Sequence, residues 1–154
     1  MRHGDSFGLW LFNDEVRSGE FPLQVWDEQN PLEVASRATQ FVRSQKYSGK
    51  SRLDVLIPRM LHVARTVKDV HLVLISTGEQ PLQGTPLDAS INEACARRQP
   101  ERRKEGKPLV TTFHVRQGEI TSATVSLAGE FIQLPERPRS EEHTSELQSP
   151  YVIS

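Results

Sequence analysis

The sequence predicts an α/β fold, a doubly wound, Rossmann-like mixed sheet with helices on both faces. Three observations predict it. Segments with helical spacing of apolar residues alternate with strand-like segments along the 154 residues. The apolar run VHLVLIS at 70–76 is typical of a strand that is buried on both faces. Capping signatures that contain proline precede two of the expected helices.

The first part of the chain predicts a hairpin followed by a helix. Two strand-like segments, 6–12 and 21–26, are separated by residues typical of turns. The signature Asn-Pro-x-Glu at 30–33 then predicts a helix that ends at about Gln45. Its expected core-facing residues are Val34, Ala35, Ala38, Phe41 and Val42.

The middle of the chain predicts a second helix and the buried strand. Ser51 is the expected N-cap, and apolar residues follow at helical spacing over 53–64. Pro58 lies inside this segment and is expected to kink the helix or to mark its start. The strand at 70–76 ends in the polar loop Thr77–Gly84. In doubly wound folds, ligands bind in such loops beyond the carboxyl ends of the strands.

The last part predicts a third helix and a meander. Thr-Pro-x-Asp at 85–88 opens the helix. Strands are expected at 107–115 and 120–127, joined by a turn, with a shorter strand at 130–135. One side of the helix carries Leu87, Ile91, Ala94, Cys95 and Arg98.

The order of these segments resembles a von Willebrand factor type A (vWA) domain of a bacterial kind. The resemblance covers about residues 4–138, through DSFGLWLFND, GKSRLDVLIPRML, VHLVLISTGEQPLQGTPLDASINEA and KPLVTTFHV. Its most specific piece is LVLISTGE, which is similar to the LISDGE of the family. The resemblance implies the doubly wound fold and a protein-binding function through a metal-ion-dependent adhesion site.

The resemblance also implies where metal ligands would stand. Ser51 is at the position of the family's threonine, and Thr77 is at the position of its aspartate. The D-x-S-x-S motif that supplies the other ligands does not occur before the first predicted strand. Two hydroxyls without a carboxylate hold a divalent cation poorly. We therefore expect a degenerate site without a cofactor, and Mg²⁺ only if a full-length protein restores the missing ligands. The alternative roles are a helix cap for Ser51 and an ordinary loop position for Thr77.

A missing first strand predicts a partial domain. In the family, that strand lies in the middle of the sheet, and residues 1–138 of this chain contain no segment for it. We therefore expect 1–138 to be an N-terminally truncated vWA-like domain from a larger bacterial protein. The sequence leaves the localisation open, with the cytoplasm as the default for this fragment, and the export or membrane anchoring of the parent protein is left open too.

The segment 139–154 predicts no function. Its first part, RSEEHTSELQS, is similar to the translation of a common sequencing-library adapter. We expect this tail to be foreign to the domain, to be disordered and to hold no site.

Other chemistry is weakly supported by the sequence. The five histidines lack metal-binding spacing, and His62 and His71 are expected to be ordinary surface or half-buried residues. Cys95 is the only cysteine and is expected to act as a small buried hydrophobe. The basic cluster at 96–107 is expected to be a solvated connection. Nucleic-acid binding is not expected, because the net charge is −1 and the cluster lacks aromatic neighbours. No apolar run is long enough to span a bilayer.

Three functional hypotheses follow. The first is a protein-interaction domain without catalysis, whose partner the sequence does not identify. The second is a small α/β hydrolase-type enzyme that uses the Thr77–Gly84 loop, with Glu79 as the base. The third is a chain without biological function as written, a partial domain joined to foreign sequence.

Overall fold

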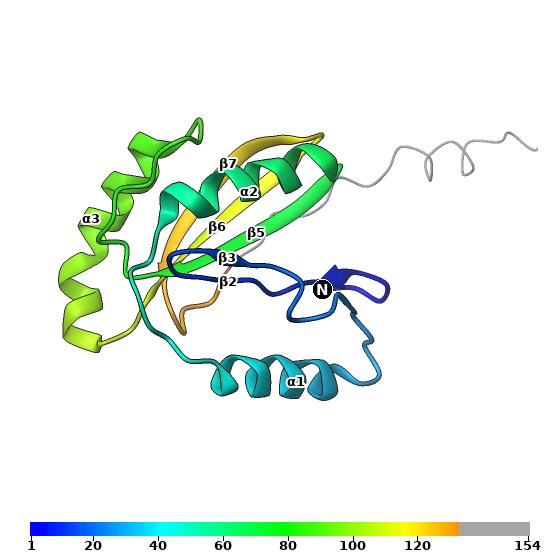
Figure 1. Ribbon diagram of the computed structural model, residues 1–154. Helices are drawn as coiled ribbons and strands as arrows, with labels where there is room; N and C mark the ends of the chain where they lie inside the picture. Colours follow the sequence, from blue (N-terminus) through cyan, green and yellow to red (C-terminus); the bar gives the residue numbers. More distant parts are fainter. Residues whose placement is uncertain (133–154) are drawn as a thin grey trace, which may run out of the picture.

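The main body is an antiparallel sheet covered by two helices. The computed structural model describes residues 1–132. The sheet has the strand order β5-β6-β7, with β5 at Asp69–Ser76, β6 at Leu109–Arg116 and β7 at Glu119–Leu127. The helices are α2 (Leu53–Thr66) and α3 (Asp88–Glu105). Figure 1 shows α2 lying along the sheet and α3 near the end at which β5 stops.

The first 45 residues form a long hairpin and a helix. Two short ladders lie one inside the other: β1 (Ser6–Phe7) pairs with β4 (Gln24–Val25), and β2 (Leu11–Phe12) pairs with β3 (Val16–Arg17). Helix α1 (Pro31–Ser44) follows and lies apart from the three-stranded sheet, with the hairpin between them (Figure 1). The predicted first helix is thus confirmed, and so is the hairpin, except that β3 lies within the segment predicted as its turn.

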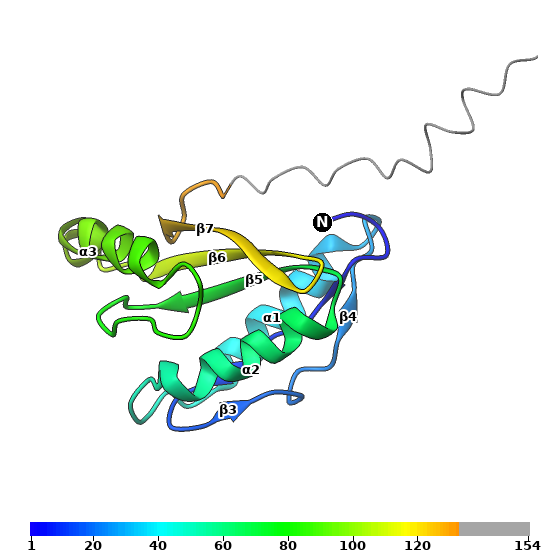
Figure 2. The same cartoon turned by 90° about the horizontal axis from the view of Figure 1, so that it is seen from above.

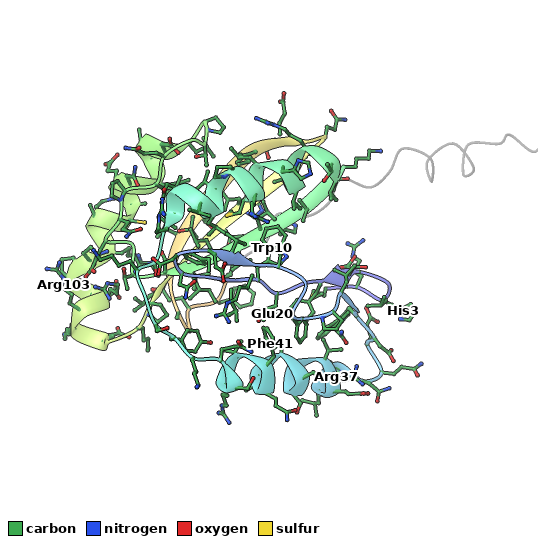
Figure 3. All side chains as sticks on the ribbon, viewed as in Figure 1. His3, Trp10, Glu20, Arg37, Phe41 and Arg103 are labelled. Carbon is green, nitrogen blue, oxygen red and sulfur yellow. The ribbon has the colours of Figure 1, made fainter. Side chains whose placement is uncertain are left out.

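A small aromatic cluster holds α1 to the hairpin. The Phe21 ring lies 5.6 Å from the Phe7 ring and 5.2 Å from the Phe41 ring, measured between centroids. Phe21 and Val34 are buried, and Phe41 extends from α1 toward the hairpin (Figure 3). Of the five residues expected to face the core, Ala35 and Val42 are exposed, so the buried side of α1 is narrower than predicted.

The larger core lies between one face of the sheet and the two helices. From α2 and α3 it takes Leu53, Leu56, Ile57, Met60, Ile91 and Cys95. From the strands it takes Leu74, Leu109, Phe113 and Leu127, which the ladder register places on one face, here called the core face. Viewed from above, α2 runs along one side of the sheet (Figure 2).

The predicted fold class is wrong. The strands of the sheet are antiparallel, not doubly wound and parallel, and the two packed helices share the core face instead of covering both faces. The vWA-like, Rossmann-like architecture is therefore not the observed one. The reason lies in the connection after β5. The loop after β5 and helix α3 bring the chain back to the end of the sheet where β5 stops. β6 therefore starts beside the end of β5, with Leu109 opposite Ser76, and runs in the opposite direction.

The doubly buried strand is β6, and the prediction of β5 for this role is also wrong. From Leu109 to Val115 every residue of β6 is buried, whereas Val73 and Ile75 of β5 are 55% and 59% exposed. β5 lies at the border of the sheet, where its side chains have a neighbouring strand on one side only. The predicted strand at 130–135 is not seen at 130–132, and its remainder lies outside the described residues, as does the tail at 139–154.

The helix starts follow the predicted signatures only in part. Pro31 occupies the first turn of α1 as expected. Helix α2 begins after Arg52, without a side-chain cap, so Ser51 is not the cap. Before α3, the Asp88 carboxylate accepts hydrogen bonds from Gly84 N–H, Thr85 N–H and the Thr85 hydroxyl. Burial opposes the ionisation of Asp88, but these three hydrogen bonds outweigh it and lower its pKa.

Helix α3 continues through Pro100 and contains most of the basic cluster. The solvated connection predicted at 96–107 is therefore wrong, because the helix ends only at Glu105. A proline inside a helix removes one backbone hydrogen bond and crowds the preceding turn.

Replacing Pro100 by alanine is therefore expected to raise the free energy of unfolding by about 1–3 kcal/mol. Pro100 is exposed, so no packing is lost. Urea denaturation would measure the change. The matched control is Arg97→Ala, an exposed site in the same helix, which should change stability by less than about 0.5 kcal/mol. A destabilised Pro100→Ala variant would contradict the prediction.

Candidate functional site

The loop after β5 is tied to α3 by side chains. The Gln99 amide donates to the Thr77 carbonyl at 2.9 Å, and the Arg102 Nε donates to Gln99 Oε1 at 2.8 Å. Arg102 also forms a 2.6 Å ion pair with Glu79. These contacts fix the loop against the helix. They use the polar groups of the loop for structure and leave Thr77 exposed.

Ser51 has different neighbours. It lies in the exposed turn before α2, where Arg52 N–H donates to the Asn13 carbonyl and the Asn13 amide donates to the Ser48 carbonyl. This turn therefore packs against the tip of the hairpin, and no hydrogen bond within the described residues joins Ser51 to Thr77.

The described residues do not fit a divalent cation at the implied position. Ser51 and Thr77 each offer a neutral hydroxyl, and the Thr77 hydroxyl already accepts a hydrogen bond from Glu79 N–H. Hard cations require several oxygen ligands, usually including carboxylates. Within residues 1–132, no group of three or more histidine, cysteine, aspartate or glutamate side chains could hold a metal ion.

Glu79 has the surroundings of a structural ion pair. Its carboxylate faces Arg102, whose side chain is 15% exposed, and the neighbouring hydrogen bonds run to backbone atoms of the loop. A general base needs a proton donor or a bound water within reach and a group that orients it. The contact described for the Glu79 carboxylate is the ion pair with Arg102, which is typical of a structural role and gives no support to the hydrolase alternative.

A shallow hollow of about 430 Å³ lies between α2 and the end of the loop. Its floor is apolar, formed by Leu53, Ile57, Pro58, Leu61 and Pro81, and Asp54 and Arg65 lie at its rim. Asp54 is engaged by Arg52 at 2.6 Å. The hollow can accept an apolar side chain, but it offers no pair of converging polar groups for chemistry.

The face of the sheet opposite the core face is called here the second face. It carries His71, Val73 and Ile75 on β5, Val110, Thr112 and His114 on β6, and Ser122, Thr124 and Ser126 on β7. β5 forms one border of the sheet, and its only strand partner among the described residues is β6 (Figures 1 and 2). The border strand therefore presents Val73 and Ile75 to solvent, each more than half exposed.

Two histidines meet on this face. His71 and His114 lie directly opposite each other on β5 and β6, and their Nδ1 atoms are 2.8 Å apart. His114 is 6% exposed, and its burial lowers its pKa, with a further lowering from the charge of His71. The rings are nearly perpendicular, at 83°.

The sequence did not identify these residues as a group. His71 was expected to be an ordinary residue, and Val73 and Ile75 were expected to be buried on both faces. Forty-three positions separate the two histidines, and only the antiparallel register of β5 and β6 brings them together. A register cannot be deduced from residue composition, so no signal in the sequence would have found the pair.

Comparison with protein-family models, with curated proteins and with solved structures finds no match for this chain. The resemblance to vWA domains thus stays a prediction from sequence. Within residues 1–132, none of the helices has the length and apolar character needed to cross a membrane.

Proposed function

We propose that this chain is a non-catalytic protein-interaction domain that binds an extended segment of a partner protein along β5. The observation that carries the proposal is the border position of β5 combined with the exposure of Val73 and Ile75. Border strands offer a row of backbone hydrogen-bonding groups to a further strand.

The backbone of β5 is suitably oriented for such pairing. The Lys68 carbonyl accepts a hydrogen bond from Gln117 N–H at the end of the β5–β6 ladder where β5 begins. Because the groups alternate along an antiparallel strand, the even-numbered residues of β5 exchange hydrogen bonds with β6. The N–H and C=O groups of Val73 and Ile75 therefore point to the other side, away from β6.

The side chains define the kind of segment that fits. Val73 and Ile75 are β-branched and uncharged, and they lie next to each other on the second face. An added strand would place its own side chains beside them, so alternating apolar, β-branched residues are expected in the partner. β5 has only 8 residues, too few for a stable dimer of two such strands alone. A partner segment that also extends over the neighbouring surface is therefore favoured over a second copy.

A random peptide library displayed on phage and selected on the full chain tests the proposal. The selected peptides are expected to contain alternating apolar residues and to shift the backbone amide NMR signals of Val73 and Ile75. Val73→Lys and Ile75→Lys should weaken their binding at least about tenfold, because border lysines disfavour strand addition.

The matched control is Val42→Lys, which places the same charge on the exposed side of α1. Its peptide affinity should equal that of the unchanged chain. Peptides that shift signals around α2 and the hollow, or that bind the Val73→Lys variant normally, would refute strand addition at β5. Dimerisation of the unchanged chain that Val73→Lys abolishes would show that a second copy is the occupant instead.

A further inference from the structure

The side of the hairpin that is turned away from α1 carries exposed apolar side chains. Gln24 accepts a hydrogen bond from Arg37 of α1, so the Gln24 side chain points toward that helix. Neighbouring residues of an extended segment point to the opposite side, and here these are Leu23 and Val25. They are 70% and 61% exposed. The aromatic cluster thus covers only the α1 side of the hairpin.

The exposed side of the hairpin faces the three-stranded sheet. The hairpin lies between α1 and the sheet (Figure 1), and its residue Phe12 packs against the core there. Trp10 is exposed and points toward the sheet rather than toward α1 (Figure 3). The three residues Trp10, Leu23 and Val25 are called here the hairpin wall.

The free border of β5 lies on the same side of the sheet as the hairpin. In Figure 1 the hairpin runs below β5, whereas β6, the strand partner of β5, lies on the other side. Two separate elements therefore present large, exposed apolar side chains around one border, namely Leu23 and Val25 from the hairpin and Val73 and Ile75 from β5. Such gatherings of exposed apolar groups are typical of interaction sites.

We infer that the hairpin wall is the second contact surface of the β5 site, and that the bound partner segment carries apolar side chains toward both surfaces. The inference rests on the proposed function, because strand addition to β5 is what holds the segment there. An added strand points alternate side chains to opposite sides. One set lies beside Val73 and Ile75, and the other set contacts the hairpin wall. The partner segment is therefore an uninterrupted run of uncharged, apolar residues.

The chemistry of the hairpin favours this occupant over a charged segment. All three side chains of the hairpin wall are uncharged, and so is Ser6, which lies opposite Val25 in the ladder. A charged segment would lose hydration on this wall without meeting a counter-charge from it. The two ladders of the hairpin have only two residue pairs each. Because short two-stranded hairpins are marginally stable alone, an apolar segment would also hold the hairpin against the sheet.

The fluorescence of Trp10 tests the inference in the full chain. The probe is a phage-selected peptide that shifts the amide NMR signals of Val73 and Ile75. The chain contains two tryptophans, so Trp26→Phe leaves Trp10 as the only one. Binding should exclude water from the Trp10 ring. Its emission is therefore expected to move to shorter wavelength, and acrylamide should quench it less.

Serine substitutions in the wall provide a second measurement. Leu23→Ser and Val25→Ser should each weaken binding of this peptide about tenfold, because the apolar burial at that position is lost. Both residues are exposed in the free chain, so neither change removes core packing. The matched control is Leu32→Ser, which removes an 82% exposed leucine from α1 and should leave the affinity unchanged.

The outcomes separate this inference from the proposed function. If the peptide shifts the signals of β5 but binds Leu23→Ser and Val25→Ser normally, the inference is overturned and strand addition stands. Unchanged emission of Trp10 on binding would overturn it in the same way. If no selected peptide shifts the signals of β5, the proposed function fails and this inference fails with it. Dimerisation of the unchanged chain that Leu23→Ser abolishes would show that a second copy covers the wall instead. If a serine variant does not fold, the emission of Trp10 decides.

Discussion

Replacing Phe113 by alanine is expected to lower the free energy of unfolding by about 3–5 kcal/mol. Phe113 is 0% exposed in the central strand β6 and belongs to the core between the sheet and the helices. Alanine would leave a cavity in this close-packed core, which also contains residues of α2, α3 and the other strands and can relax only in part. Since small domains have only about 5–15 kcal/mol of stability, this loss should be plain in urea or thermal denaturation.

The chain offers a matched control for this change. Phe131 is 92% exposed, so Phe131→Ala removes the same atoms from the surface and leaves the core intact. Its effect should be below about 0.5 kcal/mol. Similar losses for the two variants would mean that Phe113 does not pack between the sheet and the helices as described.

Replacing Gly78 by alanine is expected to cost about 2–4 kcal/mol, from two causes that add. Gly78 has φ of +66°, a conformation that alanine adopts only with strain. A Cβ atom there would also lie 2.6 Å from Cδ1 of Leu109 and 3.1 Å from the Gln99 amide nitrogen. Leu109 is fully buried, so its methyl group cannot move aside without disturbing the core.

Gly106 allows the backbone strain to be measured apart from the steric overlap. It ends α3 with the same φ of +66°, but a Cβ added there meets no atom within 4 Å. Gly106→Ala should therefore show only the backbone cost, about 1–2 kcal/mol. Measured side by side by urea denaturation, a Gly78 loss no larger than the Gly106 loss would contradict the close approach of the loop to β6.

Local structure was largely predictable. Helix α1 was expected over 30–45 and lies at Pro31–Ser44, and the strand expected at 70–76 is β5 at Asp69–Ser76. The spacing of apolar residues and the position of proline act over one or two turns of chain, so they report the local conformation directly. The capping prediction for Ser51 was wrong, because Arg52 lies at the helix start and its N–H bonds to the hairpin instead.

The arrangement of the strands was not predictable in the same way. The apolar run of β5 indicated a strand buried on both faces, whereas the strand buried along its length is β6, which contains Thr111, Thr112 and His114 and lies in the middle of the sheet. A polar residue can be buried when neighbouring strands cover it, and an apolar residue can remain exposed at a border. Composition therefore does not decide which strand is central.

The amino-acid sequence by itself indicated most of the helices and strands of this chain, though not the length of α3 or the start of α2. Only the tertiary structure decided that the strands run antiparallel, that both packed helices share one face, and that His71 meets His114 beside the exposed Val73 and Ile75. The physical reason is range. Helix and strand formation depend on neighbours within a few residues. Strand direction and register depend instead on how α3 brings the chain back to the sheet, and thus on packing between residues far apart in the sequence.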